Sequence, residues 1–408
     1  MTVCQTKRNN RLKKETAPIQ TIMITTKAKQ NIPKGWQKKQ IKDLLDYERP
    51  DKYIVESDRY ISSGIPVLTA NKSFILGYTD EKDGVYENIP AIIFDDFTTD
   101  SKFVDFPFKI KSSAIKILKE KGSDIDLRFV YEKMKSVSFP TGNHKRYYIS
   151  QYQNMDVVVP PLPEQKKIAE ILGAVDEEIQ RTDEIISATE KLKRGLMQQL
   201  FTRGIGHTKF KKTEVGEIPE GWQRVKLEDV AEVVMGQSPV SSSYNQDGVG
   251  TPFFQGKADF TPSYKTRVRY WTDQPSKFAE PDDVLLSVRA PVGDVAINEM
   301  RACIGRGLAA VRAKKEVAVQ DFLFQLLLSL KNELNSKAQG STFTAINGPA
   351  LREVVVSLPP TDEQQKIAEI LSAVDKKISV NQKLKDKLIL LKKGLMQDLL
   401  SGKVRVKS

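Results

Sequence analysis

The stretch EQKKIAEILGAVDEEI, residues 164–179, returns almost unchanged as EQQKIAEILSAVDKKI, residues 363–378. The match continues at the same offset, without a gap, to KLKRGLMQQL, which ends at Leu200, and LLKKGLMQDL, which ends at Leu399. Two gapless matches at one offset indicate an internal duplication, because self-similarity at a fixed spacing marks a repeated structural unit. We therefore expect two related halves.

Each copy of this segment has the pattern of a long amphipathic helix. Apolar residues recur at three- and four-residue steps, while Lys, Glu and Asp fill the other faces. Each helix is expected to run about 37 residues, or about 55 Å. Such a stripe needs a partner surface, and the other copy predicts an intramolecular antiparallel coiled coil. The residues expected to pair the helices or dock a partner are Ile168, Ile171, Leu172, Val175, Ile179, Leu196, Ile367, Ile370, Leu371, Val374, Ile378, Leu384, Leu388 and Leu395.

A second repeat precedes each helix. IPKGWQ begins at Ile32 and IPEGWQ at Ile218, and a strand-like run begins at Val157 and again at Val354. The predicted fold is α+β, with two α/β-type domains separated by two long helices and a pseudo-two-fold duplication. The expected segments are a basic and disordered extension (1–31), domain 1 (32–160), long helix 1 (161–204), a linker (205–217), domain 2 (218–358), long helix 2 (359–402) and a basic tail (403–408).

Inside the two domains, mixed α/β structure is expected. PAIIFDDF from Pro90 predicts a strand that enters a polar turn, and SSAIKILKEK from Ser112 predicts a short helix. DDVLLSVRAPVGDVAI from Asp282 predicts two strands joined by a Pro-Gly turn, and DFLFQLLLSL from Asp321 a buried helix. The domains share little sequence between the repeated motifs, which suggests that they read two different targets.

The formal net charge of +12 invites a nucleic-acid interpretation, but its distribution weakens that argument. Residues 1–40 contain ten Lys or Arg and one acid, and the tail adds Lys403, Arg405 and Lys407, so the remaining body is formally neutral. Any binding of nucleic acid by the body then depends on local patches. Only Cys4 and Cys303 occur, and no apolar run is long enough to cross a membrane, so a cytoplasmic, reducing location is expected.

Candidate DNA contacts follow from residue type. Arg and Lys suit guanine, Asn and Gln suit adenine, and hydroxyls suit phosphate. The alternation in YKTRVRYW from Tyr264 is also what a half-buried strand with a solvated face would show. The candidates are Lys72, Asn143, His144, Lys145, Arg146, Tyr147, Gln237, Ser238, Tyr244, Lys257, Arg267, Arg269, Arg289, Arg306, Ser341, Thr342 and Asn347.

No motif for catalysis is present. The sequence lacks GxxxxGK[ST], and GRGLAA from Gly305 does not have the glycine order of a dinucleotide site. His144, His207 and the two cysteines are too scattered for a zinc site. The neighbouring Asp95 and Asp96 are expected to point to opposite faces of a strand. We therefore expect no catalytic residue, no metal and no cofactor on this chain.

Over residues 32–402 the chain resembles the specificity subunit of type I restriction-modification systems. The resemblance rests on IPKGW and IPEGW, on LLSVRAPVGDVAI and ACIGRGLAA between Leu285 and Ala310, and on the helix starts and the GLMQ helix ends. It implies two target-recognition domains that read the halves of a bipartite, asymmetric DNA site. It also implies two modification subunits that bring S-adenosylmethionine, and motor-nuclease subunits that bring ATP and Mg²⁺.

Other interpretations stay open at this point. The chain could serve a related methyltransferase system that has no motor-nuclease, or it could be a coiled-coil scaffold that does not bind DNA. An enzyme would need a catalytic motif that the sequence lacks. A scaffold would show no preference for DNA sequence, and any binding would fall steeply with salt.

Overall fold

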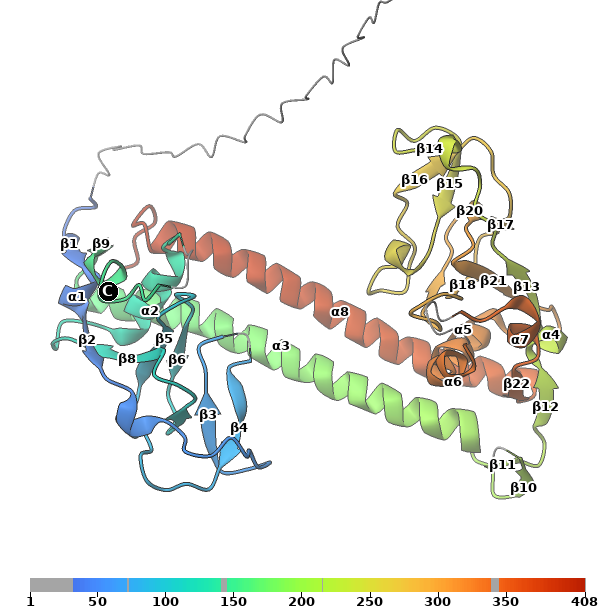
Figure 1. Cartoon of the computed structure of the whole chain (residues 1–408), viewed down its shortest axis with the longest axis horizontal. Coiled ribbons are helices and arrows are strands. Elements are labelled where there is room, and N and C mark those ends of the chain that lie inside the picture. The colour runs from blue at the N-terminus through green and yellow to red at the C-terminus, as the bar shows by residue number, and fades with distance from the viewer. Residues whose placement is uncertain (1–31, 72, 141–144, 215, 339–344, 408) are drawn as a thin grey trace, which may run out of the picture. The chain divides into compact units, whose positions relative to one another are not determined.

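The computed structural model describes residues 32–71, 73–140, 145–214, 216–338 and 345–407. The described residues form two compact units: those up to Ile171 together with those from Leu395 onward, and those from Leu172 to Gly394. Figure 1 labels the helices and strands. The expected extension, residues 1–31, lies outside the described residues. Each unit is described by itself below.

Domain 1 is built on a four-stranded antiparallel sheet in the order β2-β8-β5-β6. Its strands are β2 (Leu45–Glu48), β5 (Ala91–Asp95), β6 (Ser101–Val104) and β8 (Ile115–Glu120). The strand predicted in PAIIFDDF is confirmed as β5, all of whose residues are buried. The helix predicted in SSAIKILKEK is wrong, because this segment is β8. Between β2 and β5, its apolar residues are buried and its backbone is paired on both sides, which outweighs helix propensity.

The rest of domain 1 surrounds this sheet. A second sheet has the order β4-β3-β7, in which β3 and β7 run parallel, and β1 pairs antiparallel with β9. Helix α2 begins at an Asp126 N-cap, whose carboxylate accepts a hydrogen bond from Phe129 N. The bounds are β1 (Gln37–Gln40), α1 (Ile41–Leu44), η1 (Asp51–Tyr53), β3 (Ile65–Leu68), β4 (Ile75–Thr79), β7 (Lys109–Ile110), α2 (Leu127–Ser136), η2 (Tyr152–Asn154) and β9 (Asp156–Val159).

Domain 2 repeats this topology, with two additional strands, β14 and β17, in its second sheet. Its four-stranded sheet has the order β13-β21-β18-β19, and its second sheet, β14-β16-β15-β20-β17, contains the parallel pair β15–β20. The bounds are β12 (Gln223–Lys226), α4 (Leu227–Val230), β13 (Ala231–Met235), η3 (Ser241–Ser243), β14 (Tyr244–Asn245), β15 (Thr251–Phe254), η4 (Lys257–Asp259), β16 (Tyr270–Thr272), β17 (Phe278–Ala279), β18 (Val284–Ser287), β19 (Val295–Ile297), β20 (Ala302–Ile304), β21 (Leu308–Ala313), α5 (Gln320–Ser329), α6 (Lys331–Lys337), α7 (Gly348–Arg352) and β22 (Val355–Leu358).

Three of the sequence predictions for this half are confirmed. The two strands predicted from Asp282 are β18 and β19, which pair antiparallel. The predicted buried helix is α5, and the run from Val354 ends in β22. The segment expected as a linker, residues 205–217, contains β10 (Phe210–Thr213) and the start of β11 (Gly216–Pro219), which form a hairpin.

The two sequence repeats meet in space within each unit. In unit 1, Trp36 Nε1 donates a hydrogen bond to Glu164 Oε2 at 3.1 Å. In unit 2, Trp222 Nε1 donates to Glu363 Oε2 at 2.9 Å. The tryptophan of each IPxGW motif is therefore bound to the glutamate that begins each helix repeat, which gives both motifs a structural role.

A glutamine beside each of these glutamates ties the helix start to its domain. Gln165 accepts from Asp126 N at 2.9 Å and donates to Pro160 O at 2.9 Å. Gln364 repeats the pattern, since it accepts from Val319 N at 2.8 Å and donates to Pro359 O at 2.9 Å. Both glutamines are buried, and the repeated bonds confirm the duplication at the level of single atoms.

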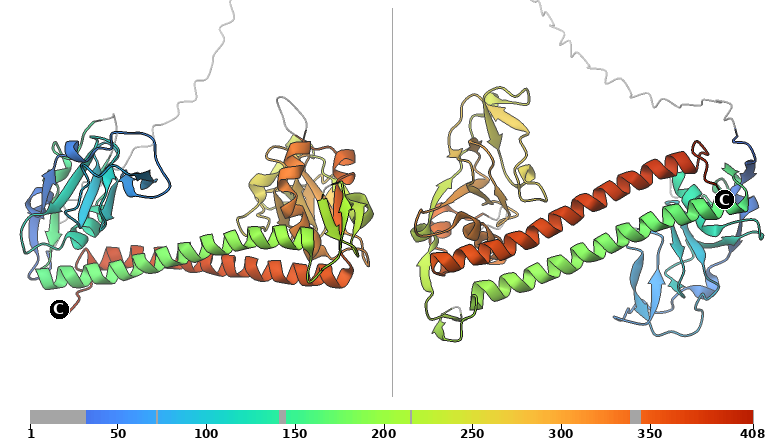
Figure 2. Two further views of the ribbon diagram at one scale, coloured as in Figure 1. Left: turned by 90° about the horizontal axis from the view of Figure 1, so that it is seen from below. Right: turned by 180° about the vertical axis from the view of Figure 1, so that it is seen from behind.

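Helices α3 (Leu162–Arg203) and α8 (Thr361–Leu399) lie side by side (Figure 2). Within unit 2, ion pairs link Lys193 to Asp375 at 2.6 Å, Lys385 to Asp183 at 2.5 Å and Lys392 to Asp176 at 2.6 Å. As the residue numbers fall along α3, those of the partners rise along α8 by equal steps. The pairing is therefore antiparallel and in one register, which confirms the predicted intramolecular coiled coil.

The seam between the helices differs from the predicted apolar stripe. Positions at alternating steps of four and three are buried or half-buried on both helices, as in a heptad repeat. Several of them are polar, including Thr182, Thr189 and Lys193 on α3. The proposed pairing residues Ile370 and Leu384 are 38% and 46% exposed. The seam positions are Val175, Ile179, Thr182, Ile186, Thr189, Lys193, Leu196, Leu200, Val374, Ile378, Asn381, Lys385, Leu388, Lys392, Leu395 and Leu399.

The first turns of α8 pack into domain 2 instead. Ile367 and Leu371 belong to the apolar core of domain 2, together with Trp222. Ile168 and Leu172, at the equivalent positions of α3, are also fully buried. On α8, one continuous apolar stripe therefore passes from the domain 2 core into the seam.

Candidate nucleic-acid interface

Domain 2 presents an exposed arginine on a tightly packed loop between β20 and β21. Gly305 N donates to Phe254 O at 2.8 Å, and Arg306 N donates to Ser238 Oγ at 3.2 Å. A Cβ at Gly307 would lie 2.5 Å from Gln255 O, so only glycine fits there. The side chain of Arg306 is exposed and forms no ion pair with any residue that the structure describes.

Two more predicted DNA contacts, Gln237 and Ser238, lie against this loop. Gln237 N donates to Ile304 O at 3.0 Å, and Ser276 Oγ donates to Gln237 O. Together with Ser238, this places three sequence-predicted residues around one loop, although about 70 residues of chain separate Gln237 and Ser238 from Arg306. The fold therefore gathers Gln237, Ser238 and Arg306 into one exposed surface.

Arg289 lies at the edge of the same surface. The preceding residue, Val288, donates its N–H to Gly307 O at 2.9 Å and accepts from Ile346 N at 3.0 Å. Arg289 itself forms an antiparallel bridge with Ala345, and its side chain is exposed. We call Arg289, Arg306, Gly307 and Ala345 the corner of domain 2.

Domain 1 carries exposed cations at the end of β5. Lys145 and Arg146 are exposed, and the Arg146 guanidinium carbon lies 5.8 Å from the centroid of the Phe97 ring. Tyr147 was predicted to contact DNA, but it is 5% exposed and packs against Phe139. Phe97 was not among the sequence candidates, because a single aromatic residue in a turn carries no signal of its own.

The buried carboxylate of Asp96 fixes the turn after β5, next to the exposed cations of domain 1. Asp96 Oδ1 accepts from Tyr148 N at 2.8 Å, and Oδ2 lies 3.3 Å from Lys116 Nζ. The Tyr148 side chain is itself buried, and desolvation by this burial is the largest of the effects that raise the pKa of its hydroxyl. The adjacent Asp95 accepts from the backbone of Phe97 and Thr98, both at 2.9 Å. Both acids therefore shape the turn that presents Phe97.

Two other predicted DNA contacts, Arg269 and Lys257, form ion pairs within domain 2. Arg269 Nη2 lies 2.7 Å from the fully buried Asp259, and Lys257 Nζ lies 2.8 Å from Asp294. Burial alone would raise the pKa of Asp294, but hydrogen bonds from Lys257 and Lys331 hold it below its usual value. These contacts give Arg269 and Lys257 structural roles.

The remaining candidates are divided between structural positions and open surface. The Tyr244 hydroxyl donates to Pro239 O at 3.0 Å, and the Asn347 side chain caps α7 by accepting from Ala350 N at 2.9 Å. Arg267 is exposed, and of the alternating run from Tyr264 only Tyr270 and Trp271 belong to a strand, β16. Lys72, Asn143, His144, Ser341 and Thr342 lie outside the described residues.

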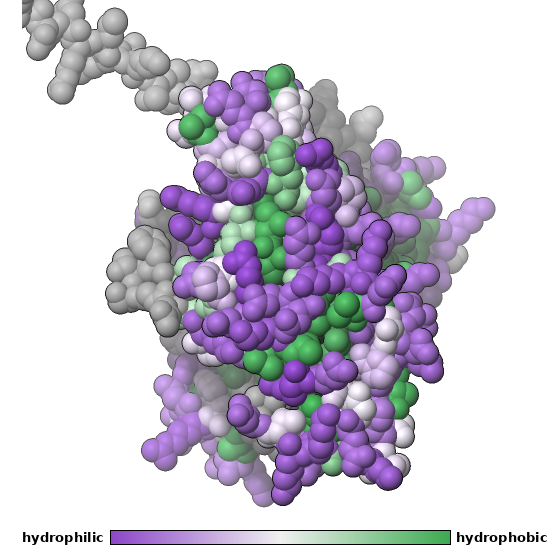
Figure 3. Space-filling model, turned by 90° about the vertical axis from the view of Figure 1, so that its right-hand side faces the viewer, coloured by the Kyte–Doolittle hydropathy of each residue, from purple (hydrophilic) through white to green (hydrophobic). Residues whose placement is uncertain are grey.

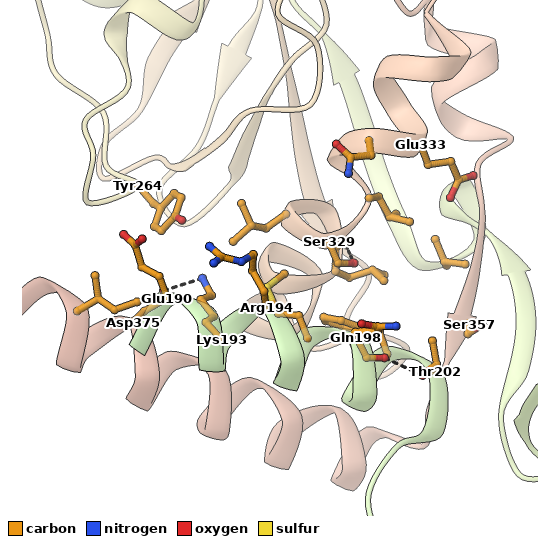
Figure 4. A pocket seen from close by; sticks show the side chains of 18 of the residues that line it. Glu190, Lys193, Arg194, Gln198, Thr202, Tyr264, Ser329, Glu333, Ser357 and Asp375 are labelled. Atoms are coloured by element: carbon orange, nitrogen blue, oxygen red, sulfur yellow. Dashed lines mark hydrogen bonds and ion pairs between the residues drawn. The ribbon is translucent and has the colours of Figure 1, made fainter. Parts of the chain in front are cut away.

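Unit 2 also contains a large groove beside the helix pair. Its volume is about 1690 Å³, and it is lined by α3, α8, α5, α6 and the β12–β22 pair. Figure 4 shows Glu190, Lys193, Arg194, Tyr264 and Asp375 at one part of its wall. In Figure 3, one end of the molecule is largely hydrophilic with a band of apolar side chains across its middle.

The described residues contain neither a metal-ligand cluster nor a membrane-spanning helix. No three His, Cys, Asp or Glu residues in this part of the chain converge as metal ligands. None of its helices is long and apolar enough to cross a membrane.

Two domains of similar topology are joined to an antiparallel helix pair, and each exposes cations, Lys145 and Arg146 in domain 1 and Arg289 and Arg306 in domain 2. This arrangement defines a class of duplicated proteins with two similar domains. The chain belongs to the family described as "Type I restriction modification DNA specificity domain", whose model matches residues 33–190 and 219–389. The match occurs twice, as the duplication requires.

Two proteins to which this chain is similar are named as specificity subunits of type I restriction enzymes. A "Putative type I restriction enzyme MjaX specificity subunit" of Methanocaldococcus jannaschii is 44% identical over 262 residues, which are 64% of this chain and 61% of that protein. The MjaVIII specificity subunit of the same organism is 28% identical and covers 92% of this chain and 95% of its own. The chain thus spans about three fifths of the first relative and nearly all of the second.

Solved structures share the fold. The type I restriction-modification S subunit from M. genitalium aligns with a TM-score of 0.65 at 17% identity, over 90% of this chain and 96% of that one. A chain from a study of the assembly of a type I R-M system aligns with a TM-score of 0.55 at 24% identity, over 91% and 99%.

Proposed function

We propose that this chain is the DNA-specificity subunit of a type I restriction-modification complex. Each domain reads one half of a bipartite, asymmetric site. One observation carries the proposal: two domains of similar topology expose different side chains, Lys145 and Arg146 in domain 1 and Arg289 and Arg306 in domain 2. A duplicated frame with different surface chemistry suits the recognition of two unlike half-sites.

The reading itself needs no catalytic group on this chain. Contacts to phosphates orient a protein on the duplex, and contacts to base edges supply the sequence preference. The helix pair serves as the spacer that sets the gap between half-sites. Its three ion pairs, Lys193–Asp375, Lys385–Asp183 and Lys392–Asp176, hold it in one register.

The helices also offer matching surfaces for partners. Ile185 and Leu192 of α3 are 43% and 54% exposed, and their repeat equivalents on α8, Leu384 and Leu391, are 46% and 51% exposed. Two equivalent apolar patches suit two copies of one partner, because exposed apolar side chains gain free energy when covered. We assign these patches to two modification subunits, which bring the adenine methyltransferase and its S-adenosylmethionine. Motor-nuclease subunits would add ATP- and Mg²⁺-dependent cleavage.

The deciding experiment maps N6-methyladenine across the genome of the source cell, with and without this gene. The proposal requires that one bipartite motif loses its methylation upon deletion and regains it when the gene is restored. An unchanged methylation map, in a cell that expresses the chain and its partners, would reject the specificity role.

A further inference from the structure

The backbone hydrogen bonds around the corner of domain 2 have equivalents in domain 1, and these define the corresponding corner of domain 1. In domain 1, Lys111 N donates to Leu68 O at 3.0 Å, at the end of the parallel β3–β7 pair. In domain 2, Gly305 N donates to Phe254 O at 2.8 Å, at the end of the parallel β15–β20 pair. Lys111 and Gly305 therefore begin equivalent loops.

Two further bonds extend the alignment. Asp96 N donates to Ala114 O at 3.0 Å, as Val288 N donates to Gly307 O at 2.9 Å. The next residues in the chain are therefore equivalent as well, so that Phe97 in domain 1 corresponds to Arg289 in domain 2.

The returning segments align in the same way. Tyr147 N donates to Asp96 O at 2.9 Å, and Ile346 N donates to Val288 O at 3.0 Å. The residue before each donor is Arg146 in domain 1 and Ala345 in domain 2. Phe97 and Arg146 therefore form the pair that corresponds to Arg289 and Ala345.

Each pair contains one arginine, supplied from opposite sides. In domain 1 the arginine comes from the returning segment and lies over the Phe97 ring. In domain 2 it follows β18 and faces the small Ala345 across the bridge. Both side chains are exposed. Neither forms an ion pair with a residue in the described part of the chain, whereas Arg269 and Arg312 are bound to the buried Asp259 and Asp283.

We propose that Arg146 and Arg289 are the equivalent base-reading residues of the two domains, and that each reads a guanine in its own half-site. A guanidinium can donate two parallel hydrogen bonds to guanine O6 and N7. The hydrogen-bonded backbone orders both positions before DNA binds, and the Phe97 ring further limits the orientations open to Arg146. This inference rests on the proposed function and adds the residues that set its sequence preference.

The test uses Arg146→Ala and Arg289→Ala in the full chain, expressed with its partners in the source cell, and maps the methylated motif. Each variant is expected to relax one base pair in one half-site only, and the two variants should affect different halves. The preference for guanine at that position should fall roughly five- to 150-fold, the factor that one bidentate pair supplies. Arg59→Ala and Arg301→Ala, which remove exposed arginines elsewhere in each domain, should leave the motif unchanged.

Lysine variants separate base reading from charge. Arg146→Lys and Arg289→Lys keep the positive charge but lose the planar fork, so they too should relax the motif. An unchanged motif in the alanine variants, with or without a uniform fall in methylation, would overturn the inference. So would loss of all methylation in both the alanine and lysine variants at normal protein level and thermal stability, because a general binding role would then explain it. If the unaltered chain directs no motif, the proposed function itself fails.

Discussion

Lys133 shows how one buried residue connects α2 to the end of α8 within unit 1. Its side chain is 9% exposed, and its Nζ donates to Leu400 O at 2.6 Å. That carbonyl lies just after the last helical residue, where a donor satisfies a group that has no partner within the helix. Desolvation by burial lowers the pKa of Lys133 to about 8.

This lowered pKa predicts a pH dependence of stability. The unfolded chain keeps the ordinary lysine pKa of about 10.4, so between about pH 8 and 10.4 it binds more protons than the folded chain. The Lys133 contribution therefore becomes more favourable as pH rises through this window, by up to about 1.4 kcal/mol per pH unit. Chemical denaturation should show the wild type gaining stability relative to Lys133→Met between pH 8 and 10.

The matched control is Lys135→Met, which changes an exposed lysine on the same helix. Its stability should follow the wild-type curve across the same pH range. Parallel curves for the wild type and Lys133→Met would show that Lys133 titrates as an ordinary lysine.

At the scale of elements, the helix pair depends on a seam that the apolar pattern alone did not locate. Leu388 lies at a half-buried seam position, whereas Leu390, two residues later, is 70% exposed. We expect Leu388→Asp to destabilise the helix pair by several kcal/mol, because it buries an unpaired charge. Val175→Asp, at a seam position of α3, should act in the same way.

Leu390→Asp is the control for these variants. It adds the same charge to the same helix turn at an exposed position and should leave the thermal midpoint and helical circular dichroism unchanged. The seam assignment would be rejected if Leu388→Asp melted like Leu390→Asp.

Strand β8 shows why a strand can be mistaken for a helix when only the local sequence is considered. Residues 115–120 contain apolar residues and lysines in an order that also suits a helix, and the local pattern favoured the wrong element. Their partners, β2 and β5, begin about 70 and 24 residues earlier in the chain. Pairing at such separations is not encoded in a short window, so only the assembled sheet decides it.

At the scale of the whole molecule, the duplication makes the two domains separable readers. Replacing residues 218–358 with the equivalent segment of another family member should change one half of the methylated motif and leave the other half intact. The reason is that domain 1 keeps its own corner, with Phe97 and Arg146. The methylation map of the chimera checks this.

The chimera should keep Glu363 and His207, which together bind the domain 2 tryptophan to the helix start: His207 Nε2 lies 2.9 Å from Glu363 Oε1. In unit 1, Arg405 binds Glu164 in the same way, with Nε 2.7 Å from Oε1. A change in both half-sites, with both of these contacts retained, would contradict independent reading by two domains.

By itself, the sequence determined the duplication, the order of domains and helices, and the family. These features depend on local periodicity and on repeated motifs, which a single chain displays directly. It also singled out Arg146 and Arg289 by residue type, without relating one to the other. Only the tertiary structure decided that relation, because the hydrogen bonds that align the two corners join strands and loops far apart in the chain. The same holds for the buried lysines of the seam, whose aspartate partners lie on the other helix.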